Sequence, residues 1–293
     1  MAIGVLVLGE SGTGKTFSIR TFKPEEVKIL SVYKSILPFR GQYEVVNTPT
    51  ADEIITELHN TDKKNIIIDD FQYILGLPMM RRIGEKGWDK FNEISQPYSD
   101  VLDEISKLDN DVIVYVMSHV ETNDDGKVKI KTIGKALDKY ITVEGLFMLV
   151  FGTLVIDQHY FFTTQNNGNN NVKTPYGMFD DMYIPNDLKY VSDKIRNYYY
   201  MPDAKSDDEI KIEDESHKVN EEDTQRRKSR RQVVKENNEK IEQYAENYEE
   251  AVREISDNKD AVEFEKVMES DISVTAPDLE KVPRRTRKKR GEA

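Results

Sequence analysis

Short runs of consecutive apolar residues recur along the first two thirds of the chain and predict buried strands. The clearest runs cover residues 3–8, 27–32, 65–70 and 112–117, with further candidate strands at 43–46, 146–155 and 159–164. A strand that helices cover on both faces is apolar at successive positions rather than at alternate ones. The pattern therefore favours the central strands of a parallel sheet.

Between these runs, the spacing of apolar residues changes to that of helices. Thr50-Ala51-Asp52-Glu53 is a capping box that predicts a helix through Leu58. A helical stretch is expected between residues 71 and 108, and shorter helices at 17–22 and from 134 to 140. The residues of the long stretch expected to face the sheet are Ile94, Tyr98, Val101, Leu102, Ile105 and Leu108. This alternation of strands and helices indicates an α/β fold.

A composition change near residue 201 divides the chain. Formal charge is −6 over residues 1–200 and −6 over the much shorter remainder, giving the total of −12. We therefore expect a folded core at 1–200, an acidic linker at 201–222 that is disordered from residue 204, a helical segment at 223–270 and a disordered basic tail at 271–293. The basic cluster at 283–290 fits either phosphate contact or a solvated tail.

Overall composition narrows the class of protein. The chain has 293 residues and no cysteine, which excludes disulfides and thiolate metal sites. No apolar run approaches the roughly 20 residues of a membrane span, and we expect no signal peptide, because the first residues lead directly into the first strand. We expect a cytoplasmic protein without a membrane partner. The negative charge argues against general polyanion binding, so nucleic acid would have to contact local basic patches.

The turn after the first strand carries the most specific motif of the chain. Its sequence fits the phosphate-loop pattern G-x-x-x-x-G-K-[ST], between a strand and a helix as the motif requires. Glycines let successive N–H groups point at an anion, and the helix N-terminus should add positive charge. The residues expected to bind the nucleotide are Gly9, Glu10, Ser11, Gly12, Thr13, Gly14, Lys15, Thr16 and Phe17. Lys15 would reach the β- and γ-phosphates, and the Thr16 hydroxyl would bind Mg²⁺.

Asp69 and Asp70 end the apolar strand at 65–70 in the manner of a Walker B motif. Ligands of open α/β sheets bind where the strands end. We assign Asp69 to Mg²⁺, held through water, and Asp70 to polarising the attacking water. The alternative is that the two acids only end the strand and cap the next segment.

Ser118-His119 follows the strand at 112–117. A polar residue beside the Walker B strand is where P-loop ATPases place a γ-phosphate sensor, and His119 is our candidate for that role. A purely structural, hydrogen-bonded histidine is the alternative. Asn123-Asp124-Asp125-Gly126 predicts the turn of a short two-stranded arm that follows.

The order of these motifs over residues 1–200 resembles the RecA-like P-loop ATPases. More narrowly, it looks like the phage-encoded nucleotide-binding proteins grouped with the Sak-type single-strand annealing recombinases, or phage AAA-type nucleotide-binding proteins. The phosphate loop and residues 66–70 carry most of the resemblance, followed by Ser118-His119, residues 134–138 and residues 173–179. Only the phosphate loop is specific by itself.

This resemblance implies a RecA-like core with a mostly parallel central sheet. It also implies an ATPase that binds ATP and Mg²⁺, binds single-stranded DNA, and promotes annealing or strand exchange in phage recombination or replication, in the host cytoplasm. Such proteins form rings or filaments in which a neighbour's lysine approaches the γ-phosphate, and Lys173 matches that position. RecA-like enzymes usually carry a glutamate after the second strand. Ser31-Val32-Tyr33-Lys34 has no acid there, which leaves Asp70, Glu10 or slow hydrolysis.

Two other functions fit the same sequence. One is a nucleotide-gated adaptor or motor subunit whose tail recruits a replication or packaging partner. The other is a small-molecule kinase, although the arginine-rich lid of such enzymes is missing. The residues most suggestive of DNA contact are Arg81, Arg82, Lys86, Lys127, Lys129 and Lys131.

Overall fold

The computed structural model describes residues 1–34, 36–87, 89–123, 126–132 and 142–217. All described residues belong to one compact unit, and every residue after His217 lies outside the described part of the chain. The helix expected at 134–140, the helical segment at 223–270 and the basic tail at 271–293 therefore also lie outside the described residues.

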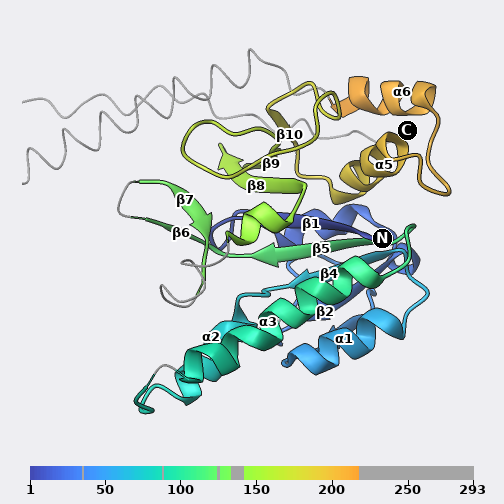
Figure 1. The fold of residues 1–293 in the computed structure, drawn as a ribbon. Helices are drawn as coiled ribbons and strands as arrows, with labels where there is room; N and C mark the ends of the chain where they lie inside the picture. Colours follow the sequence, from blue (N-terminus) through green and yellow to red (C-terminus); the bar gives the residue numbers. More distant parts are fainter. Residues whose placement is uncertain (35, 88, 124–125, 133–141, 218–293) are drawn as a thin grey trace, which may run out of the picture. The chain divides into compact units, whose positions relative to one another are not determined.

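A single large sheet forms the centre of this unit (Figure 1). Its eight strands follow the order β10-β9-β8-β1-β5-β4-β2-β3. They are Tyr183–Pro185, His159–Thr163, Leu149–Ile156, Ile3–Leu8, Ile113–Ser118, Asn65–Asp69, Val27–Ser31 and Val45–Asn47, in that order. All pairs from β8 to β3 are parallel, whereas β8, β9 and β10 pair antiparallel. The predicted mixed α/β fold with a mostly parallel sheet is confirmed and is compatible with a RecA-like core.

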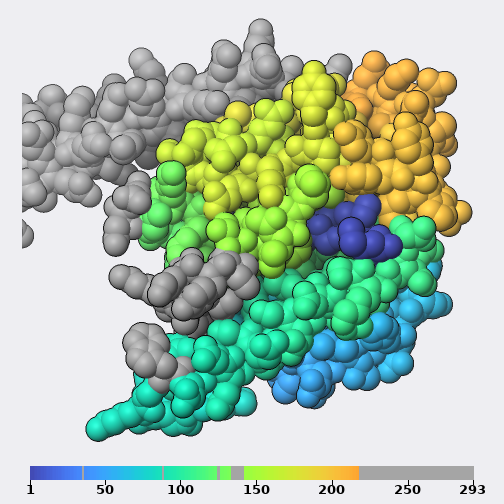
Figure 2. Space-filling model, viewed as in Figure 1, coloured from blue at the N-terminus to red at the C-terminus, as the bar shows by residue number. Residues whose placement is uncertain are grey.

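Helices cover both faces of the sheet, as the apolar runs predicted. Leu6 and Leu8 of β1 pack into the core beneath α1 (Ala51–His59), α2 (Tyr73–Arg81) and α3 (Asp89–Lys107). Alternate residues of the same strand, Val5 and Val7, pack on the other face with α5 (Leu188–Tyr198). In the space-filling view, the dark blue N-terminal residues emerge between the helices of the two faces (Figure 2).

The local helix signals are confirmed in this layer. Thr50 Oγ1 accepts from the Glu53 N–H at 3.3 Å, and Glu53 Oε2 accepts from the Thr50 N–H at 3.0 Å, which completes the capping box of α1. In α3, Ile94, Tyr98, Val101 and Ile105 are buried against the sheet, while Leu102 is partly buried. None of the described helices is long and apolar enough to cross a membrane.

The helix predicted after the phosphate loop differs in kind. It is a six-residue 3₁₀ helix, η1 (Thr16–Thr21), instead of an α-helix. Thr16, Phe17, Ile19 and Thr21 are residues of low helix propensity, and the Phe22 N–H closes the segment on the Ile19 carbonyl at 3.0 Å. So short a helix adds little dipole, and an anion at the loop would depend on backbone N–H groups and Lys15 instead.

The hairpin of β8 and β9 extends past the end of β1. Leu8, the last residue of β1, pairs with Gly152, so the rest of β8 continues beyond the sheet edge. Asp157 and Gln158 connect the two strands, and both have positive φ (49° and 66°). Two left-handed central residues give the twist of a tight two-residue hairpin. The end of this hairpin therefore lies beside the phosphate loop.

A second, smaller hairpin follows β5. It pairs β6 (Val120–Thr122) with β7 (Val128–Ile130), and the Gly126 N–H donates to the Asn123 carbonyl at 3.0 Å. The predicted two-stranded arm is confirmed. The buried carboxylate of Glu144, in η3 (Val143–Leu146), accepts from the Ile130 N–H at 2.8 Å and anchors this arm.

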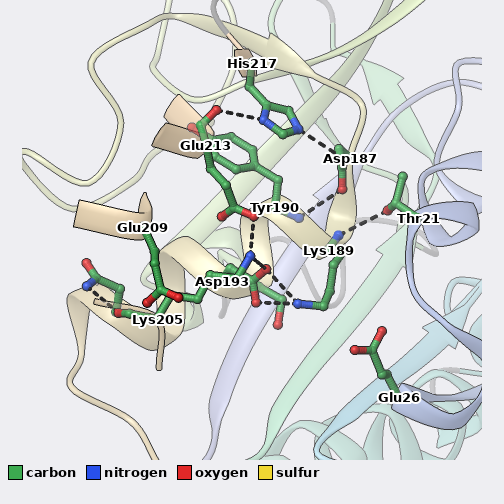
Figure 3. Close-up of polar contacts among 12 residues, drawn as sticks. Thr21, Glu26, Asp187, Lys189, Tyr190, Asp193, Lys205, Glu209, Glu213 and His217 are labelled. Atoms are coloured by element: carbon green, nitrogen blue, oxygen red, sulfur yellow. Dashed lines mark hydrogen bonds and ion pairs between the residues drawn. The ribbon is translucent and has the colours of Figure 1, made fainter. Parts of the chain in front are cut away.

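The disorder expected between 204 and 222 is wrong for residues 207–217, which form α6 (Asp207–His217) on α5 (Figure 3). Ser206 and Glu209 form a capping box: Ser206 Oγ accepts from the Glu209 N–H at 3.4 Å, and Glu209 Oε2 accepts from the Ser206 N–H at 2.9 Å. Ile210 is buried. The acidic composition suggested a solvated linker, but the cap starts a helix whose acids pair with Lys194 of α5 and with Lys205, which precedes α6.

Two lysines form ion pairs that connect α5 and α6. Lys194 pairs with Asp214 at 2.8 Å, and Lys205 bridges Asp193 of α5 and Glu213 of α6. The His217 ring stacks on Tyr190 with centroids 4.3 Å apart (Figure 3). The folded part of the described chain thus reaches at least to His217.

Candidate nucleotide-binding site

The phosphate loop has the backbone shape that its glycines predicted. Gly12 and Gly14 have φ of 78° and 101°, which is the left-handed region that other residues avoid. At Gly9 the constraint is space, since a Cβ there would lie 1.8 Å from Thr153 Oγ1. The sequence motif therefore corresponds to a loop that needs glycine at these three positions.

Thr153 of β8 supports this loop, and sequence analysis missed it. Its Oγ1 lies 3.2 Å from the Leu8 carbonyl and 2.5 Å from Thr13 Oγ1. Thr13 in turn donates to the Glu10 carbonyl at 2.8 Å. Because Thr153 is 140 positions from Thr13, only the β1–β8 pairing reveals the contact.

Lys15 lies across the loop that precedes it. Its Nζ donates to the carbonyls of Gly9 at 2.9 Å and Glu10 at 2.8 Å, and the side chain is buried. Burial lowers the pKa of Lys15, and the charges of Asp70, Asp69 and Glu10 oppose that shift. The ammonium group is therefore held by two carbonyls of its own loop, with its charge supported by three carboxylates.

Thr16 and Asp69 meet as the metal assignment requires. Thr16 Oγ1 donates to Asp69 Oδ2 at 2.8 Å, which joins the end of the loop to the end of β4. Asp69 Oδ1 is buried and has no hydrogen-bond partner within the described part of the chain. Hydroxyl and carboxylate oxygens suit Mg²⁺, which keeps several waters and uses phosphate oxygens as well. The residues present thus fit Mg²⁺.

A larger protein cage for a metal is not found: the described residues contain no group of three or more His, Cys, Asp or Glu that could hold one. Burial raises the pKa of Asp69 to about 6, and the Asp70 charge adds to the shift, while Thr16 and Lys15 oppose it. A cation bound beside Asp69 would offset this penalty and favour the ionised carboxylate.

Asp70 and His119 also come together. His119 Nε2 lies 3.2 Å from Asp70 Oδ1, and Gln72 Nε2 donates to the same oxygen at 3.3 Å. Gln72 Oε1 accepts from Ser118 Oγ and from the His119 N–H, both at 3.2 Å. Asp70 has φ of 59°, a backbone strain that an aspartate adopts at a cost. Gln72, which sequence analysis missed, joins the ends of β4 and β5.

The protonation state of His119 follows from its surroundings. Burial lowers the pKa of His119, the Lys15 charge lowers it further, and Asp70 opposes the shift. Since the ordinary pKa is only about 6.5, His119 is neutral near pH 7. Its contact with a carboxylate oxygen places the proton on Nε2. His119 therefore offers a hydrogen-bond donor at this site and no positive charge.

Tyr33 follows the end of β2, where RecA-like enzymes usually carry a glutamate. The ring of Tyr33 lies 5.6 Å from that of Tyr73, which in turn lies 6.4 Å from the His119 ring. Since Tyr33 is not an acid, Asp70 is the acid that lies beside His119.

Ser11 is the remaining residue of the phosphate loop, and it is exposed.

Lys173 lies away from this cluster. Its backbone forms an isolated antiparallel bridge with Val150, whose N–H donates to the Lys173 carbonyl at 2.8 Å. Val150 pairs on its other side with Leu6, in the middle of β1. No described contact brings Lys173 to the loop of its own chain, so its assignment to a neighbouring subunit's site stays a prediction.

The basic residues suggested for DNA lie on two protrusions. Arg81, Arg82 and Lys86 are at the junction of α2 and α3, and Lys127, Lys129 and Lys131 are on the β6–β7 arm. Both protrusions leave the edge of the sheet where β4 and β5 end (Figure 1). Arg82 pairs with Glu85 and Glu93, each at 2.7 Å, and Lys129 pairs with Glu121 at 3.1 Å.

Known proteins contribute little beyond this geometry. No protein-family model and no curated protein matches the sequence. A solved structure of a DnaB-like replicative helicase, described with its interactions with primase, is similar with a TM-score of 0.35 and 12% identity. The likeness covers 59% of this chain and 57% of that one, so the chain spans little more than half of the helicase structure. At this distance the likeness carries no argument about function.

Proposed function

We propose that this chain binds ATP with Mg²⁺ and hydrolyses it, as a RecA-like ATPase. The observation that carries the proposal is the contact between Thr16 and Asp69 beside Lys15, at the end of β1 and β4. A phosphate loop without a carboxylate from a nearby strand end could bind an anion but would lack this oxygen ligand for the metal. Here both parts occur at one sheet edge.

The residues of the site divide the work of phosphoryl transfer. Lys15 and the loop N–H groups would hold the phosphates, and Thr16 and Asp69 would hold Mg²⁺, which would supply positive charge next to the phosphate oxygens. Asp70 accepts a proton or hydrogen bond from the attacking water. His119 Nε2 donates to Asp70 in this structure, and with ATP bound it would donate to a γ-phosphate oxygen instead.

The wider role that we propose is binding of single-stranded DNA, with annealing or strand exchange in phage recombination or replication. Support comes from position: the β6–β7 arm begins directly after His119, and α2 follows Asp70 and Gln72. Basic residues on both protrusions would contact phosphates near the nucleotide. Self-association into a ring or filament, with Lys173 reaching a neighbour's site, belongs to the same proposal.

A nucleotide-gated adaptor is the second candidate. The same link between His119 and the β6–β7 arm favours it, because movement of His119 toward a phosphate would shift the arm whether or not DNA is present. In that case the segment after residue 217 would recruit a replication or packaging protein.

One experiment separates the two functions. ATP hydrolysis is measured with and without single-stranded DNA at two salt concentrations, with Lys15→Ala as the inactive control. Stimulation by DNA that weakens with salt supports the DNA-dependent ATPase, because phosphate contacts release counterions. ATP binding without a response to DNA favours the adaptor. Failure of the wild-type protein to bind ATP would contradict both.

A further inference from the structure

A pair of aromatic rings lies on the flank of the phosphate loop opposite the metal side. Phe17, in the first turn of η1, and Tyr160, in β9, have ring centroids 5.0 Å apart at an angle of 48°. A Cβ on Gly14 would lie 2.6 Å from Tyr160 Cδ1, so the tyrosine ring packs directly against the loop backbone. Both rings are only partly buried.

The order of the strands decides which end of a bound nucleotide faces these rings. β1 lies between β5 and β8. Asp69, Asp70 and His119, which would surround the metal and the γ-phosphate, all lie on the β5 side. A triphosphate lying along the loop with its γ end on that side directs its other end toward β8 and β9. That end carries the sugar and the base.

The surroundings of the two rings are fixed by polar contacts. The Arg20 guanidinium lies 3.9 Å from the centre of the Phe17 ring, and Arg20 Nη1 donates to the carbonyls of Phe17 at 2.9 Å and Asn186 at 2.8 Å. The Asn186 N–H donates to the Tyr160 carbonyl at 3.2 Å. Arg20 and Asn186 thus hold η1 against β9 and keep the two rings in place.

Asn186 supplies an independent sign of a ligand site. Its side chain is 1% exposed, and its Nδ2 has no hydrogen-bond partner among the described residues. That nitrogen would lie 3.3 Å from a Cβ on Gly14, so it is beside the loop. An unpaired buried donor is costly in a folded protein and often marks a functional site.

We propose that Phe17 and Tyr160 form the nucleobase subsite of this chain, with the base packed on the Tyr160 ring. The inference rests on the proposed nucleotide binding and adds where and how the base is held. Stacking on a ring face does not distinguish bases by their hydrogen-bond donors and acceptors. The affinity for a base therefore depends on the area that it stacks on the ring. Purine nucleotides are therefore expected to bind more tightly than pyrimidine nucleotides, with ATP and GTP close to each other.

The test compares ATP with inorganic tripolyphosphate, which has the phosphates and lacks the base. Binding of each, with Mg²⁺, is measured by calorimetry for the full chain and for Tyr160→Leu. Loss of base stacking should weaken ATP roughly tenfold or more and leave tripolyphosphate within about twofold. Tyr160→Phe retains the ring and should bind ATP as the wild type does. Tyr176→Leu, at a fully exposed tyrosine, is the matched control.

The outcomes separate this inference from the proposed function. If Tyr160→Leu weakens both ligands equally, Tyr160 only supports the loop and the base subsite is wrong, while nucleotide binding stands. If the variant binds both ligands unchanged, the base lies elsewhere. If the wild-type protein binds neither ligand, the phosphate-loop function itself fails, and the subsite with it.

Discussion

Thr16 donates its hydroxyl proton to Asp69 across 2.8 Å, and the second oxygen of Asp69 is buried with no partner among the described residues. This relationship joins a hydroxyl from the phosphate loop to a carboxylate from a neighbouring part of the sheet. It also has a cost, because a buried and half-satisfied carboxylate disfavours its ionised form. The site is therefore expected to trade stability for metal binding.

The first prediction is that Asp69→Asn stabilises the protein without ligand. The pKa of Asp69 is raised to about 6 from 3.8, so ionisation at pH 7 costs folding at most about 3 kcal/mol. Stability from the protonated form is complete below pH 4 and is lost as the pH rises through 6. In denaturant unfolding, the variant should have the larger free energy of unfolding at pH 7, and the two proteins should have equal values near pH 4.

The same variant should lose the Mg²⁺ dependence of nucleotide binding. Asp100→Asn, on the exposed face of α3, is the control and should change neither property. A variant no more stable than the wild type at pH 7 would contradict the account of Asp69 as a strained metal ligand.

The second prediction concerns Lys15. Lys15→Ala removes the only cationic side chain that donates within the described loop and should weaken ATP binding by roughly 100-fold. Lys107→Ala changes an exposed lysine at the C-terminal end of α3 and should bind as the wild type does. Fluorescent-nucleotide titration measures both. Unchanged ATP affinity in Lys15→Ala would refute the site assignment.

The comparison of sequence and structure is instructive at particular positions. Runs of apolar residues predicted β1, β4 and β5 because strands covered on both faces need no alternation. The loop motif predicted the backbone shape at Gly12 and Gly14, because other residues avoid the positive φ that both adopt. Local signals were thus sufficient wherever a feature depends on neighbouring residues.

Contacts between distant residues could not be predicted in this way. Thr153 and Tyr160 reach the loop only because β8 pairs with β1, and Gln72 contacts Ser118, which lies 46 positions further along the chain. The acidic composition after residue 204 suggested disorder, although the sequence contains the capping box of Ser206 and Glu209 that begins α6. There the average charge was a poorer guide than the local pattern.

The third prediction follows from α6. A chain ending at Met201 should be less stable than one ending at His217. It loses the buried Ile210, leaves Lys194 without Asp214, and leaves Asp193 with Lys189 but without Lys205. A loss of about 1–3 kcal/mol corresponds to several degrees in Tm for a domain of this size. Calorimetry of the two chains measures the difference. Equal Tm values would show that α6 packs without stabilising the core.

The fourth prediction assigns Gln72 a positioning role. Gln72→Leu removes the link between Asp70, Ser118 and the His119 N–H, while Lys15, Thr16 and Asp69 keep their contacts. We expect kcat for ATP hydrolysis to fall roughly tenfold or more, with ATP affinity within about twofold. Gln96→Leu, an exposed glutamine of α3, is the matched control. A purely structural role would instead lower Tm and change affinity together with kcat, and unchanged kcat would remove Gln72 from the mechanism.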